Sequence, residues 1–212
     1  MYFLELLISG IAVGSLYALI AMGFVLIYKG TGVINFAQGE AIMVAAFIAY
    51  YLVGFGVPFW LAVPLTLVAS ALLGGLTERL IIRPLLGEPV FSVVMITIGL
   101  SIFLRSMAGI IFGHHNYVFP SPFPVEPLHW GGIVLSHNHL WSMIISFSLM
   151  LLFFFFFKFA RLGLGMRATA NDQDTATLMG INIKRVYALT WGISFVVAGL
   201  AGVGLANVMV LN

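Results

Sequence analysis

The chain is dominated by long runs of apolar residues that contain few charges. Five runs are long enough to form helices across a membrane, and they cover residues 4–28, 59–76, 90–112, 140–157 and 186–210. A bilayer core requires about 20 apolar residues in a helix. A sixth run, residues 41–55, reaches that length only if its helix begins near Val33. The pattern predicts an all-α polytopic integral membrane protein with about six transmembrane helices.

Composition excludes a soluble domain of this size. Hydrophobic residues make up 62% of the 212 residues and charged residues only 8%, whereas ordinary soluble domains are about a quarter charged. The N-terminus has no basic region before its first apolar run, so we expect no cleaved signal peptide. No Gly/Ser-rich linker divides the chain, and residues 1–212 are therefore expected to form a single membrane domain.

Basic residues in the connecting segments predict the orientation of the spans. Five of them lie between the last two runs, namely Lys158, Arg161, Arg167, Lys184 and Arg185, whereas residues 113–139 contain no Lys or Arg. Cytoplasmic loops of membrane proteins carry the excess of Lys and Arg. We therefore expect the 158–185 segment to be cytoplasmic and the N-terminus to be external.

Small residues at four-residue spacing mark two candidate packing seams. The first span contains Gly10, Gly14 and Ala18, and the last contains Ala198, Gly202 and Ala206. Helices in lipid associate through such residues because they let the backbones approach closely. Both stripes are interpreted as contacts between helices.

Two groups of polar residues fall within membrane spans. On a helix that begins near Val33, Asn35 and Gln38 share one face, and Glu40 points elsewhere, toward the cytoplasmic interface. The polar face either forms interhelical hydrogen bonds or lines a substrate pathway. In the fourth span Thr97, Ser101 and Arg105 form one stripe. Arg105 either extends its guanidinium to the outer interface or faces a solute cavity, where it could attract a carboxylate.

Several kinds of chemistry are not expected from this chain. It has no cysteine and no G-x-x-x-x-G-K-[ST], H-E-x-x-H or G-x-S-x-G motif, so we expect neither ATP hydrolysis nor another enzymatic activity. The five histidines, His114, His115, His129, His137 and His139, have irregular spacing and no acidic or thiol partners, and we expect no metal site. The HNH at residues 137–139 lacks the acidic partners of a nuclease, and we expect no nucleic-acid partner.

The cytoplasmic segment contains signals for a short helix. Asn171 is placed as its N-cap, Asp172 and Asp174 favour its positively polarised start, and Gly180 ends it. Asn182 can cap the last span. A helix lying crosswise between two spans suggests docking onto a cytoplasmic partner.

Four motifs in this order, INFAQGE, ERLIIRPL, TIGLS and MRATANDQDTATLMGINIKRV, resemble the membrane permease subunits of branched-chain amino acid ABC importers. The resemblance implies a permease of the plasma (inner) membrane that forms a translocation path. The polar residues identified above, Asn35, Gln38, Thr97, Ser101 and Arg105, are our candidates for that path. In ABC permeases a helix marked E-A-A-x-x-x-G enters a groove of the ATPase. Asp174, Thr175, Ala176 and Gly180 occupy that spacing, with Asp for Glu and Thr for Ala, and Asn171 and Asp172 complete the expected coupling segment.

The resemblance also implies partners: a second permease subunit, two ATPase subunits that bind the ATP, an external solute-binding protein and membrane lipid. This chain itself would need no cofactor. Family members usually continue with further spans, so we expect a permease domain shortened at its C-terminus. Two alternative functions remain: a gradient-driven carrier or channel for a small solute, and an inactive truncated membrane subunit.

Overall fold

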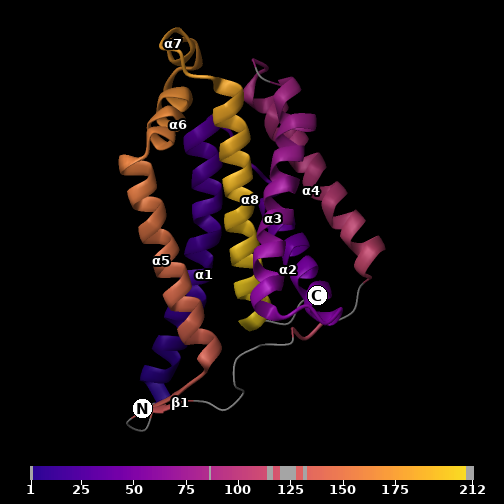
Figure 1. The fold of residues 1–212 in the computed structure, drawn as a ribbon, viewed down its shortest axis with the longest axis vertical. Coiled ribbons are helices and arrows are strands. Elements are labelled where there is room, and N and C mark those ends of the chain that lie inside the picture. Colours follow the sequence, from indigo (N-terminus) through magenta and orange to yellow (C-terminus); the bar gives the residue numbers. More distant parts are fainter. Residues whose placement is uncertain (1, 86, 114–116, 120–127, 131–132, 209–212) are drawn as a thin grey trace.

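The computed structural model describes residues 2–85, 87–113, 117–119, 128–130 and 133–208, and these residues fold almost entirely into helices (Figure 1). In chain order the elements are α1 (Tyr2–Thr31), α2 (Gln38–Gly54), α3 (Phe59–Thr77) continued by the short turns η1 (Glu78–Ile82) and η2 (Arg83–Leu85), α4 (Val90–Phe112), β1 (Leu128–Trp130), β2 (Ile133–Leu135), α5 (His137–Phe159), α6 (Arg161–Asn171), α7 (Gln173–Leu178) and α8 (Ile183–Val208). The two strands pair antiparallel, with Leu128 opposite Leu135.

The predicted fold class is confirmed. Five helices, α1, α3, α4, α5 and α8, are long and apolar enough to cross a membrane, and α2 is a shorter apolar helix of 17 residues. Proline sets the start of two of them, because Pro58 and Pro89 directly precede α3 and α4 with φ near −55°. The fixed φ of proline and its missing N–H suit such a position. The described chain is a multi-pass helical membrane protein.

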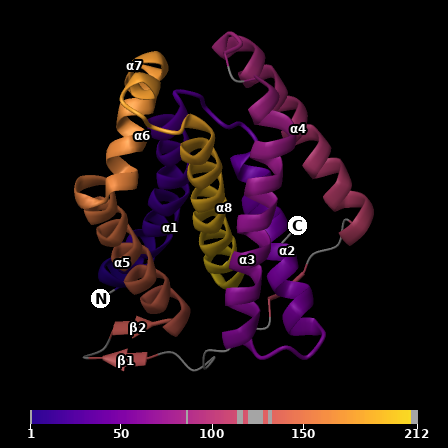
Figure 2. The ribbon, with the colours of Figure 1, turned by 45° about the horizontal axis from the view of Figure 1, so that its top comes forward.

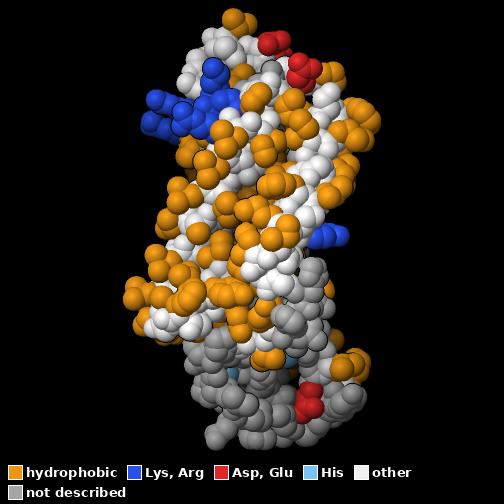
Figure 3. All heavy atoms as spheres, turned by 90° about the vertical axis from the view of Figure 1, so that its right-hand side faces the viewer, with side chains coloured by type: hydrophobic (Ala, Val, Ile, Leu, Met, Phe, Trp, Pro, Cys, Tyr) orange, Lys and Arg blue, Asp and Glu red, His pale blue; other side chains and the backbone are white. Residues whose placement is uncertain are grey.

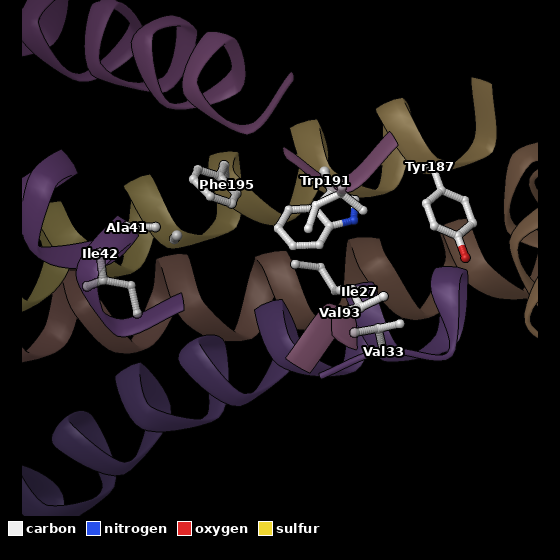
Figure 4. Packing of buried hydrophobic residues seen from close by; sticks show 10 residues of the cluster. Ile27, Val33, Ala41, Ile42, Val93, Tyr187, Trp191 and Phe195 are labelled. Atoms are coloured by element: carbon white, nitrogen blue, oxygen red, sulfur yellow. The ribbon is translucent and has the colours of Figure 1, made fainter. Parts of the chain in front are cut away.

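Helix α8 is the centre of the bundle. It packs against α1, α2 and α3, and Figures 1 and 2 show it between α1 on one side and α3 on the other. Its Trp191 and Val197 are fully buried. Figure 4 shows Trp191 and Phe195 of α8 beside Ile27 of α1, Ala41 and Ile42 of α2 and Val93 of α4. Segments far apart in the sequence therefore share one core.

One of the two predicted packing seams is confirmed and the other is wrong. Ala198, Gly202 and Ala206 are buried on α8. A Cβ on Gly202 would lie 2.5 Å from the Ile42 carbonyl oxygen of α2. Gly10, Gly14 and Ala18 are instead exposed on α1, and no heavy atom lies within 4 Å of a Cβ built on Gly10 or Gly14. Helix α1 packs through another face, which contains the buried Ala12, Leu16 and Leu19. The two leucines make more van der Waals contacts with the neighbouring helices than a glycine can.

Basic side chains gather toward the end of the molecule that carries α7 (Figure 3). Lys29 and Lys158 lie in the last turns of α1 and α5, and Lys184 and Arg185 begin α8. Between this end and the part drawn in grey, the face in Figure 3 is largely hydrophobic, as expected of a surface in contact with lipid. This distribution agrees with the predicted cytoplasmic placement of the 158–185 segment, which remains a prediction.

Single-cysteine labelling tests the orientation directly, because the natural sequence contains no cysteine. Phe55 follows α2 and is 82% exposed, and Thr177 is exposed on α7 at the other end. With a membrane-impermeant maleimide, Phe55→Cys should react in intact cells, whereas Thr177→Cys should react only after permeabilisation. Labelling of both variants in intact cells would contradict the orientation.

Candidate functional site

Helix α2 begins deep inside the bundle, and not near Val33 as the sequence suggested. Its first residue is Gln38, and residues 33–37 form no continuous helix. The Ser194 hydroxyl of α8 donates to Gly23 O (2.9 Å) and to Gln38 Oε1 (3.2 Å). Gly23 lies eight residues before the end of α1, which is about 12 Å along the helix. The chain therefore leaves α1 and re-enters the bundle before α2 starts.

Asn35 lies in this re-entrant segment and not on the helical face predicted for it. Its Oδ1 accepts a hydrogen bond from Ala37 N at 3.0 Å, and its Nδ2 donates to Gln38 Oε1 at 3.4 Å. The hydrogen bond from Ala37 N to Asn35 Oδ1 closes a local turn. Such a turn competes with helix formation, which explains the later start of α2. Asn35 and Gln38 nonetheless come together, and both are fully buried.

Thr97 connects the re-entrant segment to α4. Its hydroxyl accepts a hydrogen bond from Phe36 N at 3.3 Å and donates to Val94 O at 2.8 Å. Non-helical backbone at membrane depth persists only where protein or a cavity satisfies it. Gln38 Nε2 is buried and has no hydrogen-bond partner among the described residues. The cluster thus contains a free donor at membrane depth.

Glu40 and Arg105 form an ion pair, with Glu40 Oε1 2.5 Å from Arg105 Nη2. The expectation that Glu40 reaches the cytoplasmic interface is wrong, because the deep start of α2 places its first turn beside the middle of α4. The Glu40 side chain is 8% exposed and that of Arg105 is 74% exposed. Along the predicted α4 stripe, Thr97 is buried, Ser101 is half-buried and Arg105 is open.

Removing one partner of this ion pair should lower the stability of the fold. In Arg105→Met the Glu40 carboxylate stays buried without its counter-charge, and we expect a loss of stability of about 3 kcal/mol. Adding Glu40→Gln should restore most of that loss, because a neutral amide needs no cation. Unfolding midpoints of the purified proteins, arranged as a double-mutant cycle, measure the coupling. Arg79→Met, which changes an exposed arginine, is the control, and strictly additive effects would show that the pair contributes nothing.

The segment predicted to be cytoplasmic contains two helices, α6 and α7, where one was expected. Asn171 ends α6 and is not the N-cap of α7. That cap is Asp172, whose Oδ1 accepts hydrogen bonds from Asp174 N (2.9 Å) and Thr175 N (3.1 Å). Carboxylates are strong N-caps because they satisfy free N–H groups at the positively polarised helix end.

The same contacts make the Asp172 cap sensitive to acid. Hydrogen bonds from Thr175, first from its hydroxyl and then from its N–H, lower the pKa of Asp172 below its ordinary value. A carboxylate whose pKa is lowered by folding stabilises the folded helix above its unfolded pKa. This contribution is lost as the pH falls through the lowered value, well below neutral pH.

Gly180 ends α7 as predicted. Its φ is +81°, a conformation that strains residues with a Cβ. Gly180 N donates to Thr177 O and Ile181 N to Ala176 O, the hydrogen-bond pattern of a Schellman ending. The prediction that Asn182 caps the last span is also confirmed, since its Oδ1 accepts from Arg185 N at 3.1 Å.

Helix α7 offers an apolar tip to its surroundings. Leu178 is 86% exposed and Met179 is 79% exposed, and Figure 1 shows α7 at the end of the molecule away from the N-terminus. Among the predicted coupling residues Asp174 and Thr175 are exposed, whereas Ala176 is buried against the fold. The sequence interpretation did not include the two apolar tip residues.

A hydrogen-bonded connection joins α7 to the re-entrant segment. Gln173 Nε2 donates to Tyr187 Oη at 2.9 Å, and that hydroxyl donates to Thr31 O at 3.0 Å. Thr31 is the last residue of α1, directly before the chain re-enters the bundle. Sequence reasoning missed Tyr187 and Ser194. The signal was present, because Tyr187, Thr190 and Ser194 form a polar stripe on an apolar helix.

The described residues contain no group of three or more His, Asp or Glu side chains arranged for a metal ion. Of the five histidines, His137 and His139 begin α5. His114 and His115 and the side chain of His129 lie outside the described part of the chain.

Comparison with known proteins places this chain in a family. The family model described as "Branched-chain amino acid transport system / permease component" matches residues 6–210. The chain belongs to this permease family. As a permease it is a transport subunit and not an enzyme, and ATPase activity lies in a separate subunit of such systems.

Curated relatives agree with this assignment. The permease is 31% identical to the high-affinity branched-chain amino acid transport system permease protein LivH of Escherichia coli K12, over 96% of this chain and 70% of the relative. It is 30% identical to BraD of Pseudomonas aeruginosa, a permease protein of the same description, over 95% of this chain and 70% of the relative. The probable LivH of Methanocaldococcus jannaschii is 26% identical to it, over 92% of this chain and 63% of the relative. No solved structure matches the permease.

Proposed function

We propose that this permease forms part of the inward path for branched-chain or closely related small amino acids, powered by partner ATPase subunits that bind the ATP. A second permease subunit and an external solute-binding protein complete the assembly in the plasma (inner) membrane. The names of the relatives supply the solute class. Helix α7 is the contact with the ATPase, and the chain itself holds no cofactor.

The observation that carries the proposal is the connection from α7 to the re-entrant segment. An ATPase that moves α7 would displace Gln173, and Tyr187 would transmit the displacement to the carbonyl of Thr31. From there only a few residues lead to Asn35 and Gln38, which are buried at membrane depth. A contact outside the bilayer is thereby coupled to polar groups inside it.

Asn35, Gln38, Thr97, Ser101 and Arg105 belong to the path in this proposal. Ser101 and Arg105 are accessible in the single subunit, and the buried Asn35, Gln38 and Thr97 join the wall when the helices move. An arginine facing hydrocarbon near the middle of a span costs about 2.5–3.5 kcal/mol on insertion scales. Arg105 is 74% exposed in the single subunit, so we place it against water or a second subunit in the assembly. Its remaining N–H groups can bind the carboxylate of an amino acid, while Glu40 holds the guanidinium in position.

ATP-dependent uptake into vesicles that contain the permease and its partner subunits tests this function. Tyr187→Phe keeps the buried ring and removes both hydrogen bonds of its hydroxyl, so uptake should fall several-fold while the ATPase still co-purifies. Tyr28→Phe is the matched control, because Tyr28 lies near the same end of α1 and is 56% exposed. Uptake that needs no ATP would indicate a gradient-driven carrier. Normal uptake by Tyr187→Phe would show that the connection through Tyr187 does not couple α7 to the path.

A further inference from the structure

A groove of about 410 Å³ lies along one side of the bundle, between α1, α5 and α6. Figures 1 and 2 both show α5 and α6 beside α1, away from α2 and α4. The groove is therefore separate from the polar cluster around the start of α2. Its lining combines apolar side chains with three cations, Lys29, Lys158 and Arg167.

The lining residues change from apolar to cationic along the groove. On α1, Met22, Val25 and Lys29 follow one another on one face, and Lys29 lies in the last turn. On α5 the lining runs from Met150 to Lys158, which also lies in the last turn. Each helix thus contributes an apolar stripe about 10–12 Å long that ends in a cation. Arg167 of α6 adds a third positive charge.

These three cations have no carboxylate partner in the described part of the chain, where the ion pairs are Glu78 with Arg83 and Glu40 with Arg105. Lys158 Nζ lies 5.6 Å from the centre of the Phe154 ring and 5.4 Å from that of Phe159. Such contacts hold the ammonium group over the aromatic side chains at the mouth of the groove. The site therefore has an excess of positive charge directly above an apolar channel.

We propose that this groove binds an anionic phospholipid, with its phosphate between Lys29, Lys158 and Arg167 and an acyl chain along Met22, Val25 and Met150. The bilayer that surrounds the helices supplies such a molecule, and it matches both parts of the groove. Basic pockets between transmembrane helices bind anionic headgroups, and each Lys or Arg near the membrane surface contributes to that attraction. A protein partner would match the apolar part only if it also brought carboxylates to this position.

The test measures the phospholipid retained by the purified permease. After exchange into nanodiscs that contain equal amounts of phosphatidylglycerol and phosphatidylcholine, native mass spectrometry should find phosphatidylglycerol preferentially retained. Neutralising Lys29, Lys158 and Arg167 to glutamine in turn should weaken retention about fivefold at each step. The control is Lys184→Gln with Arg185→Gln, which removes two basic charges at the same end of the molecule but outside the groove.

A second variant keeps all three cations. Val25 is 46% exposed in the groove, and Val25→Trp should fill the apolar channel and abolish retention, whereas Val68→Trp at an exposed site on α3 should not. Equal retention of both lipids by the unchanged permease, or full retention by the triple glutamine variant, would overturn the proposal. Displacement of the lipid by inorganic phosphate would also overturn it, because the site would then bind phosphate without the acyl chain. A co-purified protein in place of lipid would assign the groove to a subunit contact.

Discussion

Replacing Leu178 and Met179 together by aspartate should abolish ATP-linked uptake and ATPase association while leaving the protein folded in the membrane. Both side chains are almost fully exposed at the tip of α7, so the change removes little buried surface, and exposed substitutions usually alter stability by about 0.5 kcal/mol or less. In the proposed assembly, the loss falls on the contact between α7 and the ATPase. Burying two carboxylates in an apolar groove of another subunit without counter-charges is strongly unfavourable. Co-purification of the ATPase and vesicle uptake measure the two effects.

The matched control keeps the tip apolar. Leu178→Ile with Met179→Leu retains the hydrophobic surface and should preserve both ATPase association and uptake. The hydrogen bonds of α7 to Asp172 and its Schellman ending do not involve the changed side chains, so the helix itself should persist in both variants. Normal uptake by the aspartate variant would mean that α7 is a connector with no role in coupling.

Replacing Gly202 by alanine should destabilise the bundle even though alanine favours a helix by about 1 kcal/mol. The added Cβ would lie 2.5 Å from the Ile42 carbonyl oxygen and 3.2 Å from Ala46 N. These are backbone atoms of α2, and no rotation of a side chain can relieve the contact. Helices α2 and α8 must separate, and we expect a net loss of about 2–3 kcal/mol. Thermal unfolding of the purified protein in detergent measures it.

Gly14→Ala is the control for this prediction. Gly14 is also a glycine within a transmembrane helix, but a Cβ there meets no heavy atom within 4 Å. The variant should be unchanged or more stable by up to about 1 kcal/mol. Equal destabilisation by Gly14→Ala and Gly202→Ala would show that the α2–α8 contact is not the cause. The comparison also tests why one predicted packing seam was right and the other was wrong.

Local signals in the sequence were sufficient for most of the helices. Apolar runs of spanning length identified α1, α3, α4, α5 and α8, since a bilayer requires about 20 such residues. Gly180 and Asn182 were correctly placed at a helix end and a helix start, because both act within their own turn. Asn171 was misplaced as a cap by one residue. Its neighbour Asp172 is equally suited to capping, and propensity alone does not separate the two.

The apolar length of its segments determined from the sequence alone that this protein is a helical membrane protein, because hydrocarbon satisfies no backbone group and each spanning segment must bond internally. Only the tertiary structure decided where its polar groups lie. The deep start of α2 depends on hydrogen bonds with Thr97 of α4 and Ser194 of α8. Glu40 of α2 forms its ion pair with Arg105, which lies 65 residues further along the chain. The link from Gln173 through Tyr187 to Thr31 joins three helices. Such contacts depend on how helices are placed against one another, which the periodicity of a single helix does not contain.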